Sequence, residues 1–220
     1  MRIFGSLILT GLAVLSGCVD ENSSIYISHV GLFTYEAEEG CSVTEDAYLT
    51  RATFNVAFAE NSYVLPAIVV SQLVRRDVST SAETNGVHIH GAEVQILNEA
   101  GAAITPEYSI VASGGVYIPP SAVGDSASRA ISFNVIPAPV TAILQDLVRS
   151  EGAQTIVVNM RVFGRTTGGT DVESGYFRFG IELVDDPDDV LCDSAEVREE
   201  FPLVNCVSGQ DGVPYLARCI

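Results

Sequence analysis

The sequence predicts an all-β protein. Apolar and polar residues alternate with the period of a β-strand through much of the chain, and only one segment has a helical period. Turn-forming residues recur at short intervals, and no alternation of strands with helices indicates a parallel sheet. We therefore expect an immunoglobulin-like or Greek-key β-sandwich with one short crossover helix at about residues 139–150, and a jelly roll is the alternative.

Two late segments, separated by the Gly- and Thr-rich residues 164–170, are expected to form an antiparallel hairpin with one buried face. Their alternating apolar residues are Ile156, Val158, Met160 and Val162, followed by Phe177, Phe179, Ile181 and Leu183. Further strands are predicted at residues 25–33, 63–73 and 93–97, and in the alternating runs 54–58 and 131–135. Pro66 is expected to make the start of the 63–73 strand an edge or a bulge, because proline donates no ladder hydrogen bond.

One segment, between Pro139 and Gly152, is predicted to be helical. Proline suits the first turn of a helix, and glycine suits the position just after the last turn. Apolar residues recur there at helical spacing, namely Val140, Ile143, Leu144, Leu147 and Val148. A single helix among many strands indicates a crossover connection that caps one end of the sandwich.

Length and charge limit the organisation and the partners. We predict a signal peptide at residues 1–17, a tether at 18–24, a sandwich domain at 25–190 and a disulfide-stapled tail at 191–220. The chain has 28 acidic residues against 11 basic ones, all of them Arg, and its net charge is −17. Nucleic acids and anionic lipid surfaces require clustered basic residues, so neither is an expected partner.

The first 18 residues have the pattern of an export signal. Met1-Arg2 is a short positive region, and the apolar run Ile3 to Leu15 is too short to cross a hydrocarbon core of about 30 Å as a helix. Residues Leu15-Ser16-Gly17-Cys18 then resemble the lipobox of bacterial lipoproteins. The resemblance implies cleavage before Cys18, a diacylglycerol thioether on its sulfur and an acylated, typically palmitoylated, amine. Such proteins are held on a bilayer by several acyl chains, and Val19 in place of Asp favours the outer membrane.

Four cysteines follow the one in the lipobox. They are Cys41, Cys192, Cys206 and Cys219. An even number in an exported protein predicts two disulfides, and four cysteines allow three connectivities between which the sequence does not choose. Three of the four lie in the last 29 residues, so one bridge lies within the tail whichever connectivity holds.

His88 and His90 are the candidate metal ligands. Histidines two apart on a strand project from one face, and this pair resembles the His-x-His strand of copper/zinc superoxide dismutase, itself a β-sandwich. That family uses further histidines and an Asp, whereas this chain offers only His29 besides the pair. Glu93 or the acidic run at residues 185–189 is the candidate source of a third ligand. We therefore expect a structural pair and no metal cofactor.

A regular strand would place these two histidines on the face of the sheet that is expected to be buried. In an unbroken strand both would share a face with the apolar residues of the 92–96 segment, and two unpartnered core histidines would be costly. We expect either that Gly91 forms a bulge that reverses the facing, or that residues 84–90 are a loop.

The one acidic run holds four carboxylates in five residues, Asp185, Asp186, Asp188 and Asp189. Calcium binds oxygen ligands with flexible geometry, so these residues are candidate calcium ligands. The Gly and the distal Glu of an EF-hand loop are missing from the sequence that follows. We expect a solvated acidic loop at the boundary between sandwich and tail.

The C-terminal half resembles a group of uncharacterised bacterial lipoproteins. The resemblance is carried by Gly164-Arg165-Thr166, Gly168-Gly169-Thr170, the Phe177 to Leu183 segment, and the run from Cys206 through Gln210-Asp211-Gly212 to Cys219. It implies relatedness and carries over no catalytic residue. No nucleophile elbow, phosphate loop or zinc-protease motif is present in the sequence either.

These observations predict a lipid-anchored protein of the cell envelope, non-catalytic and of binding or structural type. Its expected partners are the membrane, through the lipid, and an envelope protein or a glycan. The alternatives are a metal-binding protein or metalloenzyme that uses His88 and His90, and a calcium-dependent adhesion module that uses the acidic run.

Overall fold

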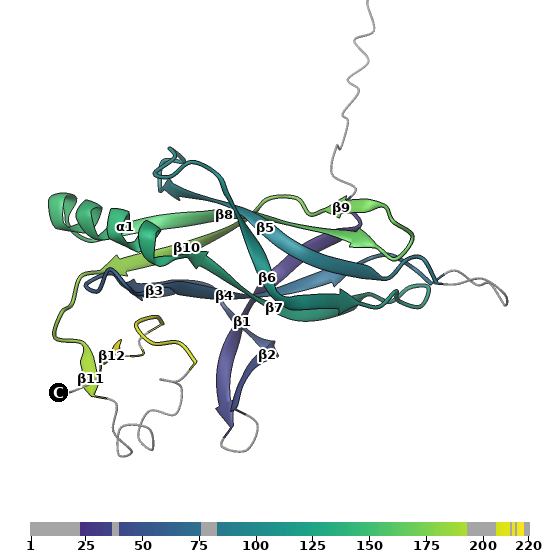
Figure 1. The fold of residues 1–220 in the computed structure, drawn as a ribbon, viewed down its shortest axis with the longest axis horizontal. Coiled ribbons are helices and arrows are strands. Elements are labelled where there is room, and N and C mark those ends of the chain that lie inside the picture. Colours follow the sequence, from purple (N-terminus) through teal and green to yellow (C-terminus); the bar gives the residue numbers. More distant parts are fainter. Residues whose placement is uncertain are drawn as a thin grey trace, which may run out of the picture.

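The computed structural model describes residues 23–36, 40–75, 83–192, 206–211, 213 and 215–217, and Cys18 and Cys219 lie outside them. Two β-sheets pack face to face, and a single helix lies at one end of them (Figure 1). The predicted all-β sandwich with one short crossover helix is therefore confirmed.

The first sheet has four strands in the order β2-β1-β4-β7, and every pair in it is antiparallel. Its strands are β1 (Ile25–Glu36), β2 (Gly40–Leu49), β4 (Tyr63–Ser71) and β7 (Ala127–Ile136). β1 pairs with β4 up to Val30 and with β2 from Val30 onward. The β1–β2 hairpin therefore projects beyond the body of the sandwich (Figure 1).

The second sheet has the order β3-β10-β8-β5-β6, with β9 paired to the end of β8. Its strands are β3 (Ala52–Asn55), β5 (Val87–Asn98), β6 (Tyr108–Ile118), β8 (Gln154–Thr166), β9 (Asp171–Glu173) and β10 (Phe177–Val184). The β3–β10 pair is parallel and the others are antiparallel. Two further strands, β11 (Val190–Cys192) and β12 (Tyr215–Ala217), form a separate parallel pair.

The core lies between the two sheets and is built by the alternation that the sequence predicts. β8 and β10 form the predicted hairpin, in a register that runs from Phe177 opposite Met160 to Leu183 opposite Gln154. Their inward-facing residues are completely or almost completely buried, apart from Phe177, which is half-buried. The facing sheet contributes Leu65 and Phe133, both fully buried, so one continuous apolar core holds the layers together.

The helix α1 (Ala138–Glu151) carries the chain from β7 in the first sheet to β8 in the second. Proline lies in its first turn and Gly152 follows its last turn with φ of 88°, a conformation that favours glycine. α1 lies at the end of the sandwich where β3 and β10 meet (Figure 1). No helix in the described residues is long and apolar enough to cross a membrane.

Val140, Leu144 and Val148 are buried as predicted, but the rest of the buried face of α1 differs from the predicted one. Ile143, expected in the core, is 48% exposed, whereas Thr141 and Gln145 are buried. The reason is a polar contact: the Thr141 hydroxyl donates to the Asn61 carbonyl, and the Gln145 amide donates to the carbonyls of residues 56 and 57. These bonds rotate the helix toward the 56–61 loop.

The strand predicted over residues 54–58 ends early, at Asn55. The Asn55 side chain accepts a hydrogen bond from the Ala57 amide and so turns the chain out of the sheet. Phe58 therefore lies in a bend and is only half-buried, and its predicted place in a strand is wrong.

Pro66 lies where the sequence predicts an edge. β4 pairs with β1 only from Ala67 to Ser71, so residues 63–66 have β7 on one side and no strand on the other within the part of the chain that the structure describes. This open stretch of β4 is the place where the C-terminal segment docks.

Candidate functional site

The histidine pair lies on the outer face of the six-stranded sheet. β5 begins at Val87, and its pairing with both neighbours shifts register between Ile89 and Gly91. His88 and His90 are exposed on the near side of this bulge, while the apolar residues beyond it face the core. Of the two arrangements that the sequence allows, the bulge is the correct one.

Gly91 makes the bulge sterically feasible. A Cβ atom at this position would lie 2.2 Å from the Ile110 carbonyl oxygen and 2.9 Å from the ring of Phe163. Any other residue would have to displace backbone of the neighbouring strand β6. The glycine therefore fixes the point at which the face of β5 reverses.

The neighbours of His88 are an aromatic ring and a cation. The centroids of the His88 and Tyr117 rings are 4.9 Å apart, and the cross-strand partner of His88 on β8 is Arg165. The Arg165 guanidinium is itself 2.9 Å from the Asp171 carboxylate. Hence this carboxylate is held by an arginine beside the histidine.

The proposed third ligand, Glu93, is held in an ion-pair network. Its carboxylate accepts a hydrogen bond of 2.6 Å from Arg161 Nε, and a second carboxylate, Glu173, lies 3.0 Å from Arg161 Nη1. The guanidinium carbon lies 5.4 Å from the centroid of the Tyr176 ring, whose hydroxyl donates to Glu107. The hydrogen bond with Glu93 raises the pKa of Arg161, so the guanidinium keeps its charge.

A shallow cavity of about 250 Å³ lies beside this network. It is lined by His90, Glu93, Phe163, Gly164, Asp171, Val172 and Glu173. Among the described residues, no three His, Cys, Asp or Glu side chains are placed to hold a metal ion. The cavity offers a polar surface with the phenyl ring of Phe163, the imidazole of His90 and carboxylates already paired to arginines.

The four carboxylates of the acidic run do not converge on a common point. Asp185 pairs with Arg149 of α1 at 3.2 Å, and Asp186 accepts a hydrogen bond from the backbone amide of Asp188. Asp189 receives a long contact of 3.5 Å from the Asn55 side chain. Asp185, Asp186 and Asp188 are exposed, so the run is tied to the α1 end of the sandwich by individual bonds.

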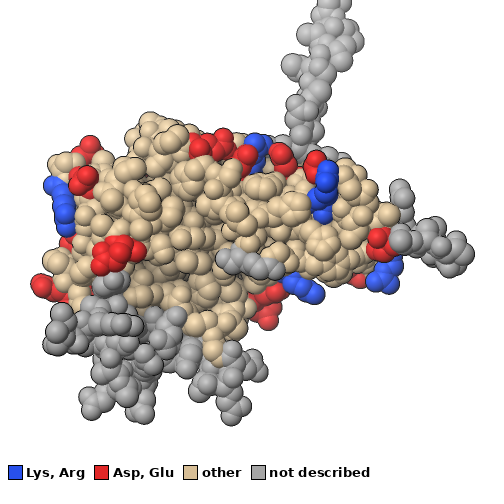
Figure 2. Space-filling model, in the orientation of Figure 1, with Lys and Arg blue, Asp and Glu red and all other residues tan. Residues whose placement is uncertain are grey.

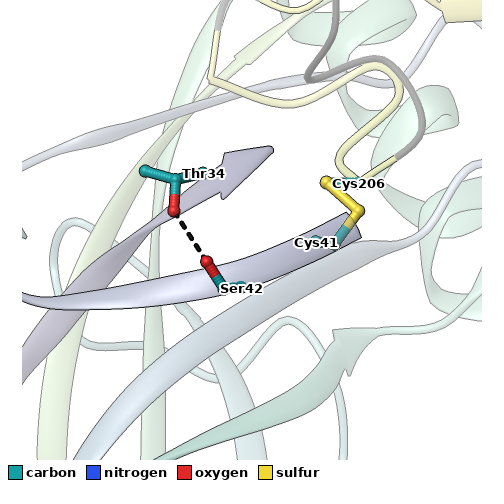
Figure 3. Close-up of a disulfide and its surroundings, with 4 residues drawn as sticks. All are labelled: Thr34, Cys41, Ser42 and Cys206. Carbon is teal, nitrogen blue, oxygen red and sulfur yellow. Dashed lines mark hydrogen bonds between the residues drawn. A yellow bond between two sulfur atoms is a disulfide. The ribbon is translucent and has the colours of Figure 1, made fainter. Parts of the chain in front are cut away.

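One disulfide joins the tail to the sandwich. Cys206 is bonded to Cys41 at the start of β2, across 165 residues of sequence (Figure 3). The β1–β2 hairpin that carries Cys41 is further linked across its two strands by the hydroxyls of Thr34 and Ser42, 2.9 Å apart (Figure 3). The backbone of Cys192 lies in β11 opposite Ala217, two residues before Cys219.

Residues 206–211, which we call the clasp, close the seam between the two sheets. On the β3 side, Asn55 N donates to the Gly209 carbonyl and Asp211 N donates to the Thr53 carbonyl. On the β4 side, the Gln210 side chain both accepts from Val64 N, at 2.9 Å, and donates to Val64 O, at 3.0 Å. The clasp thus supplies hydrogen bonds to the open stretch of β4 and to the edge of β3.

The Asp211 carboxylate lies half-buried beneath this seam. It accepts hydrogen bonds from Thr53 N, the Tyr63 hydroxyl and the Gln210 side chain. Burial raises the pKa of Asp211, and the three hydrogen bonds oppose that rise without cancelling it. Burial and the adjacent Asp211 charge raise the pKa of Tyr63, so its hydroxyl remains a donor.

Charged side chains on the face shown in Figure 2 lie mainly around its rim, and uncharged residues occupy the middle. Acidic and basic groups are interspersed along the rim, and no basic patch is visible on this face. This face offers no basic platform for a phosphate backbone.

Comparisons with known proteins add no family. No family model matches the chain, and no curated protein matches it. One similar solved structure is a protein from Archaeoglobus fulgidus, with 14% identity over 61% of this chain and 94% of that one and a TM-score of 0.30. Another is the CooA pilin subunit from enterotoxigenic Escherichia coli, with 10% identity over 74% of this chain and 99% of that one and a TM-score of 0.27.

Proposed function

We propose that the protein is a lipid-anchored, non-catalytic domain of the bacterial cell envelope that binds an envelope protein or a glycan. The lipobox-like residues Leu15 to Cys18, placed directly after a short apolar run, support acylation of Cys18. Val19 in place of Asp supports retention at the outer membrane.

The disulfide between Cys41 and Cys206 is the observation that carries the proposal. Disulfides persist in oxidising compartments such as the bacterial periplasm and cell surface and are rare in the cytosol. This bond holds the clasp on the sandwich and so belongs to the architecture of the domain. A structural disulfide of this kind supports export, which acylation at Cys18 also requires.

The start of the folded body lies close to the proposed anchor. The Ser24 carbonyl accepts a hydrogen bond from Gln72 N, and the side chain of Ile25 is fully buried. Ser24 is the sixth residue after Cys18, and a fully extended chain of that length spans only about 20 Å. The anchor would therefore keep the start of β1 near the bilayer.

The first experiment is metabolic labelling with a radioactive fatty acid in the native bacterium. We expect label on the wild-type protein and none on a Cys18→Ser variant, because the thioether requires the Cys18 sulfur. The Cys41→Ser/Cys206→Ser variant is the matched control and should keep its label. An unlabelled wild-type protein, or a Cys18→Ser variant that still fractionates with the membrane, would contradict the proposal.

The partner is sought by crosslinking the intact lipoprotein in cells and identifying its neighbours by mass spectrometry. The prediction is one reproducible envelope neighbour, or a crosslinked glycan, which is lost when the protein is detached from the membrane by Cys18→Ser. A uniform background of neighbours would argue against a specific binding role.

A further inference from the structure

A second cavity, of about 310 Å³, lies at the β9 end of the sandwich, and among the described residues it shares Val172 with the cavity beside His90. Its lining residues come from the start of β1, the segment after β4, the segment before β5 and the β8–β9 turn. They are Ser24, Leu73, Thr84, Asn85, Thr166, Gly168, Thr170 and Val172. The described lining residues supply hydroxyl, amide and apolar groups, and none of them is charged.

The frame of this cavity is fixed by hydrogen bonds between the 83–86 segment and the β8–β9 turn. Gly168 N donates to the Thr84 carbonyl, Thr167 N donates to the Gly86 carbonyl, and the Thr167 hydroxyl donates to the Glu83 carbonyl. A site held in this way needs little rearrangement to bind a ligand, which favours affinity.

Several polar groups of the lining remain available. Within the described residues, the hydroxyls of Ser24 and Thr170 make no hydrogen bond to the protein. The Thr166 hydroxyl accepts from Thr170 N, at 3.0 Å, and retains its own hydrogen for donation. The Asn85 amide is oriented by its bond to the Val74 carbonyl, at 2.6 Å.

The chemistry of the cavity matches an uncharged sugar. A sugar ring presents hydroxyl groups at its edge, which both donate and accept, and C–H groups on its faces. Ser, Thr and Asn side chains likewise donate and accept, while Leu73 and Val172 supply apolar contact for a ring face. A volume of about 310 Å³ suits one or two rings. The net charge of −17 disfavours anionic ligands, and none of the described lining residues offers a carboxylate to a cation.

We propose that this cavity binds the uncharged sugar of a glycolipid headgroup or of a free glycan. The inference rests on the proposed function for its location, because Ser24 lies six residues from the acylated Cys18. The cavity would therefore be within about 20 Å of the membrane surface, where headgroup sugars are found.

The test uses the acylated full-length protein in phosphatidylcholine nanodiscs. Saturation-transfer NMR with methyl α-glucoside and with N-acetylglucosamine measures binding of soluble sugars, and glucose 6-phosphate is the charged probe. In a second arm the nanodiscs contain a glucosyl diacylglycerol. Soluble sugar that binds equally well in both discs points to a free glycan, and binding that the glycolipid suppresses points to a headgroup.

The decisive variant is Thr84→Val/Thr170→Val, which replaces two hydroxyls with methyl groups of similar shape. We expect it to weaken sugar binding at least about tenfold, because each lost hydrogen bond reduces affinity several-fold. Thr170→Val alone is the second variant, since that hydroxyl makes no bond within the described protein and its loss leaves the fold intact. Thr155→Val, at the other end of β8, is the matched control and should bind like wild type.

The inference would be overturned if no saturation were transferred from the protein to either neutral sugar. It would also be overturned if both variants transferred saturation as strongly as the wild type. Binding of glucose 6-phosphate as strong as that of the glucoside would overturn the assignment to uncharged ligands. A protein that is acylated at Cys18 but binds no sugar would refute this inference alone and leave the anchored domain standing.

Discussion

At the scale of single residues, the Gln210 side chain makes the pair of backbone hydrogen bonds that a neighbouring strand would otherwise make. Its amide occupies both the N–H and the C=O of Val64, which no neighbouring strand in the described residues reaches. Gln210 is 2% exposed, so water cannot replace these bonds without opening the seam.

Gln210→Ala should therefore destabilise the protein by about 2–4 kcal/mol, because it leaves a buried donor and a buried acceptor unpaired. The measurement is chemical denaturation of the purified protein. Gln95→Ala, on the outer face of β5, is the control and should change stability by less than about 0.5 kcal/mol. Equal effects of the two variants would show that the Val64 bonds contribute nothing.

Asp211 predicts a pH dependence of stability. Its folded-state pKa is raised above the usual 3.8, so the folded protein holds this proton in a pH range where the unfolded chain has lost it. The contribution of Asp211 is therefore fully present below pH 3.8 and declines as pH rises through the higher folded-state pKa.

Asp211→Asn should flatten this dependence, because an amide does not ionise. Its oxygen can still accept from Thr53 N and the Tyr63 hydroxyl, whereas its NH2 group cannot accept from Gln210. The measurement is the free energy of unfolding from pH 4 to 7 for variant and wild type. As pH rises, we expect the free energy of unfolding of the variant to increase relative to that of the wild type. A difference that is constant across this range would show that Asp211 does not titrate in the folded protein.

The sequence located the reversal of β5 at residue level but could not choose its mechanism. The parity of His88 and His90 against the apolar residues that follow requires a break near Gly91. Whether that break is a bulge or a loop depends on the Ile110 carbonyl and the Phe163 ring, which approach from strands β6 and β8. Periodicity within β5 contains no information about either neighbour.

At the scale of whole elements, the period of α1 predicts its position and bounds but not its rotation. Apolar spacing places Ile143 in the core, whereas the structure buries Gln145 because the 56–61 loop presents carbonyls to it. A helix that covers loop backbone needs donors on its buried face, and a hydrophobic pattern does not record that need.

Gln145→Leu should thus destabilise the protein by about 1–3 kcal/mol, even though it makes the helix more apolar, because two loop carbonyls lose their donor. Ile143→Ala is the control and should have a small effect, since Ile143 is 48% exposed. Thermal unfolding monitored by circular dichroism distinguishes them. If Ile143→Ala proved the more damaging change, the buried face of α1 would have been misassigned.

β2 and β6 show the other limit of sequence reasoning about elements. The burial of β2 does not alternate, because its register against β1 shifts between Val30 and Leu32. The pairing of β6 with β5 shifts in the same way. Val111 lies opposite Gly91 and Val116 lies opposite Ile89, so five residues along β6 correspond to two along β5. Strands with such shifts lose the period of two on which their prediction depends.

At the scale of the whole molecule, the clasp joins parts of the chain that are far apart in sequence. Cys206 is bonded 165 residues back to Cys41, and Asp211 contacts Thr53 across 158 residues. Cysteine count predicts a stapled tail, but the docking of Gln210 and Asp211 into the seam depends on three short segments that meet only in the folded protein. This is why the sandwich could be predicted and its closure could not.

The Cys41→Ser/Cys206→Ser variant should lose about 2–4 kcal/mol of stability, as expected when a bond closing a long loop is removed. The amides of Asn55 and Asp211 should remain partly protected from hydrogen exchange, because Gln210 and the backbone still hold the clasp. Mass spectrometry of exchanged peptides measures this. Full exchange at both amides would show that the sulfur bond alone keeps the clasp in place.

The position of the Cys41–Cys206 bond also bears on how the molecule would respond to a protease. A single cut anywhere between Cys192 and Cys206 would divide the polypeptide in two, yet the short product would stay joined to the long one through sulfur. Such a nicked protein would migrate as one species in denaturing electrophoresis until a reductant was added. Before reduction, the clasp would stay bonded to the sandwich.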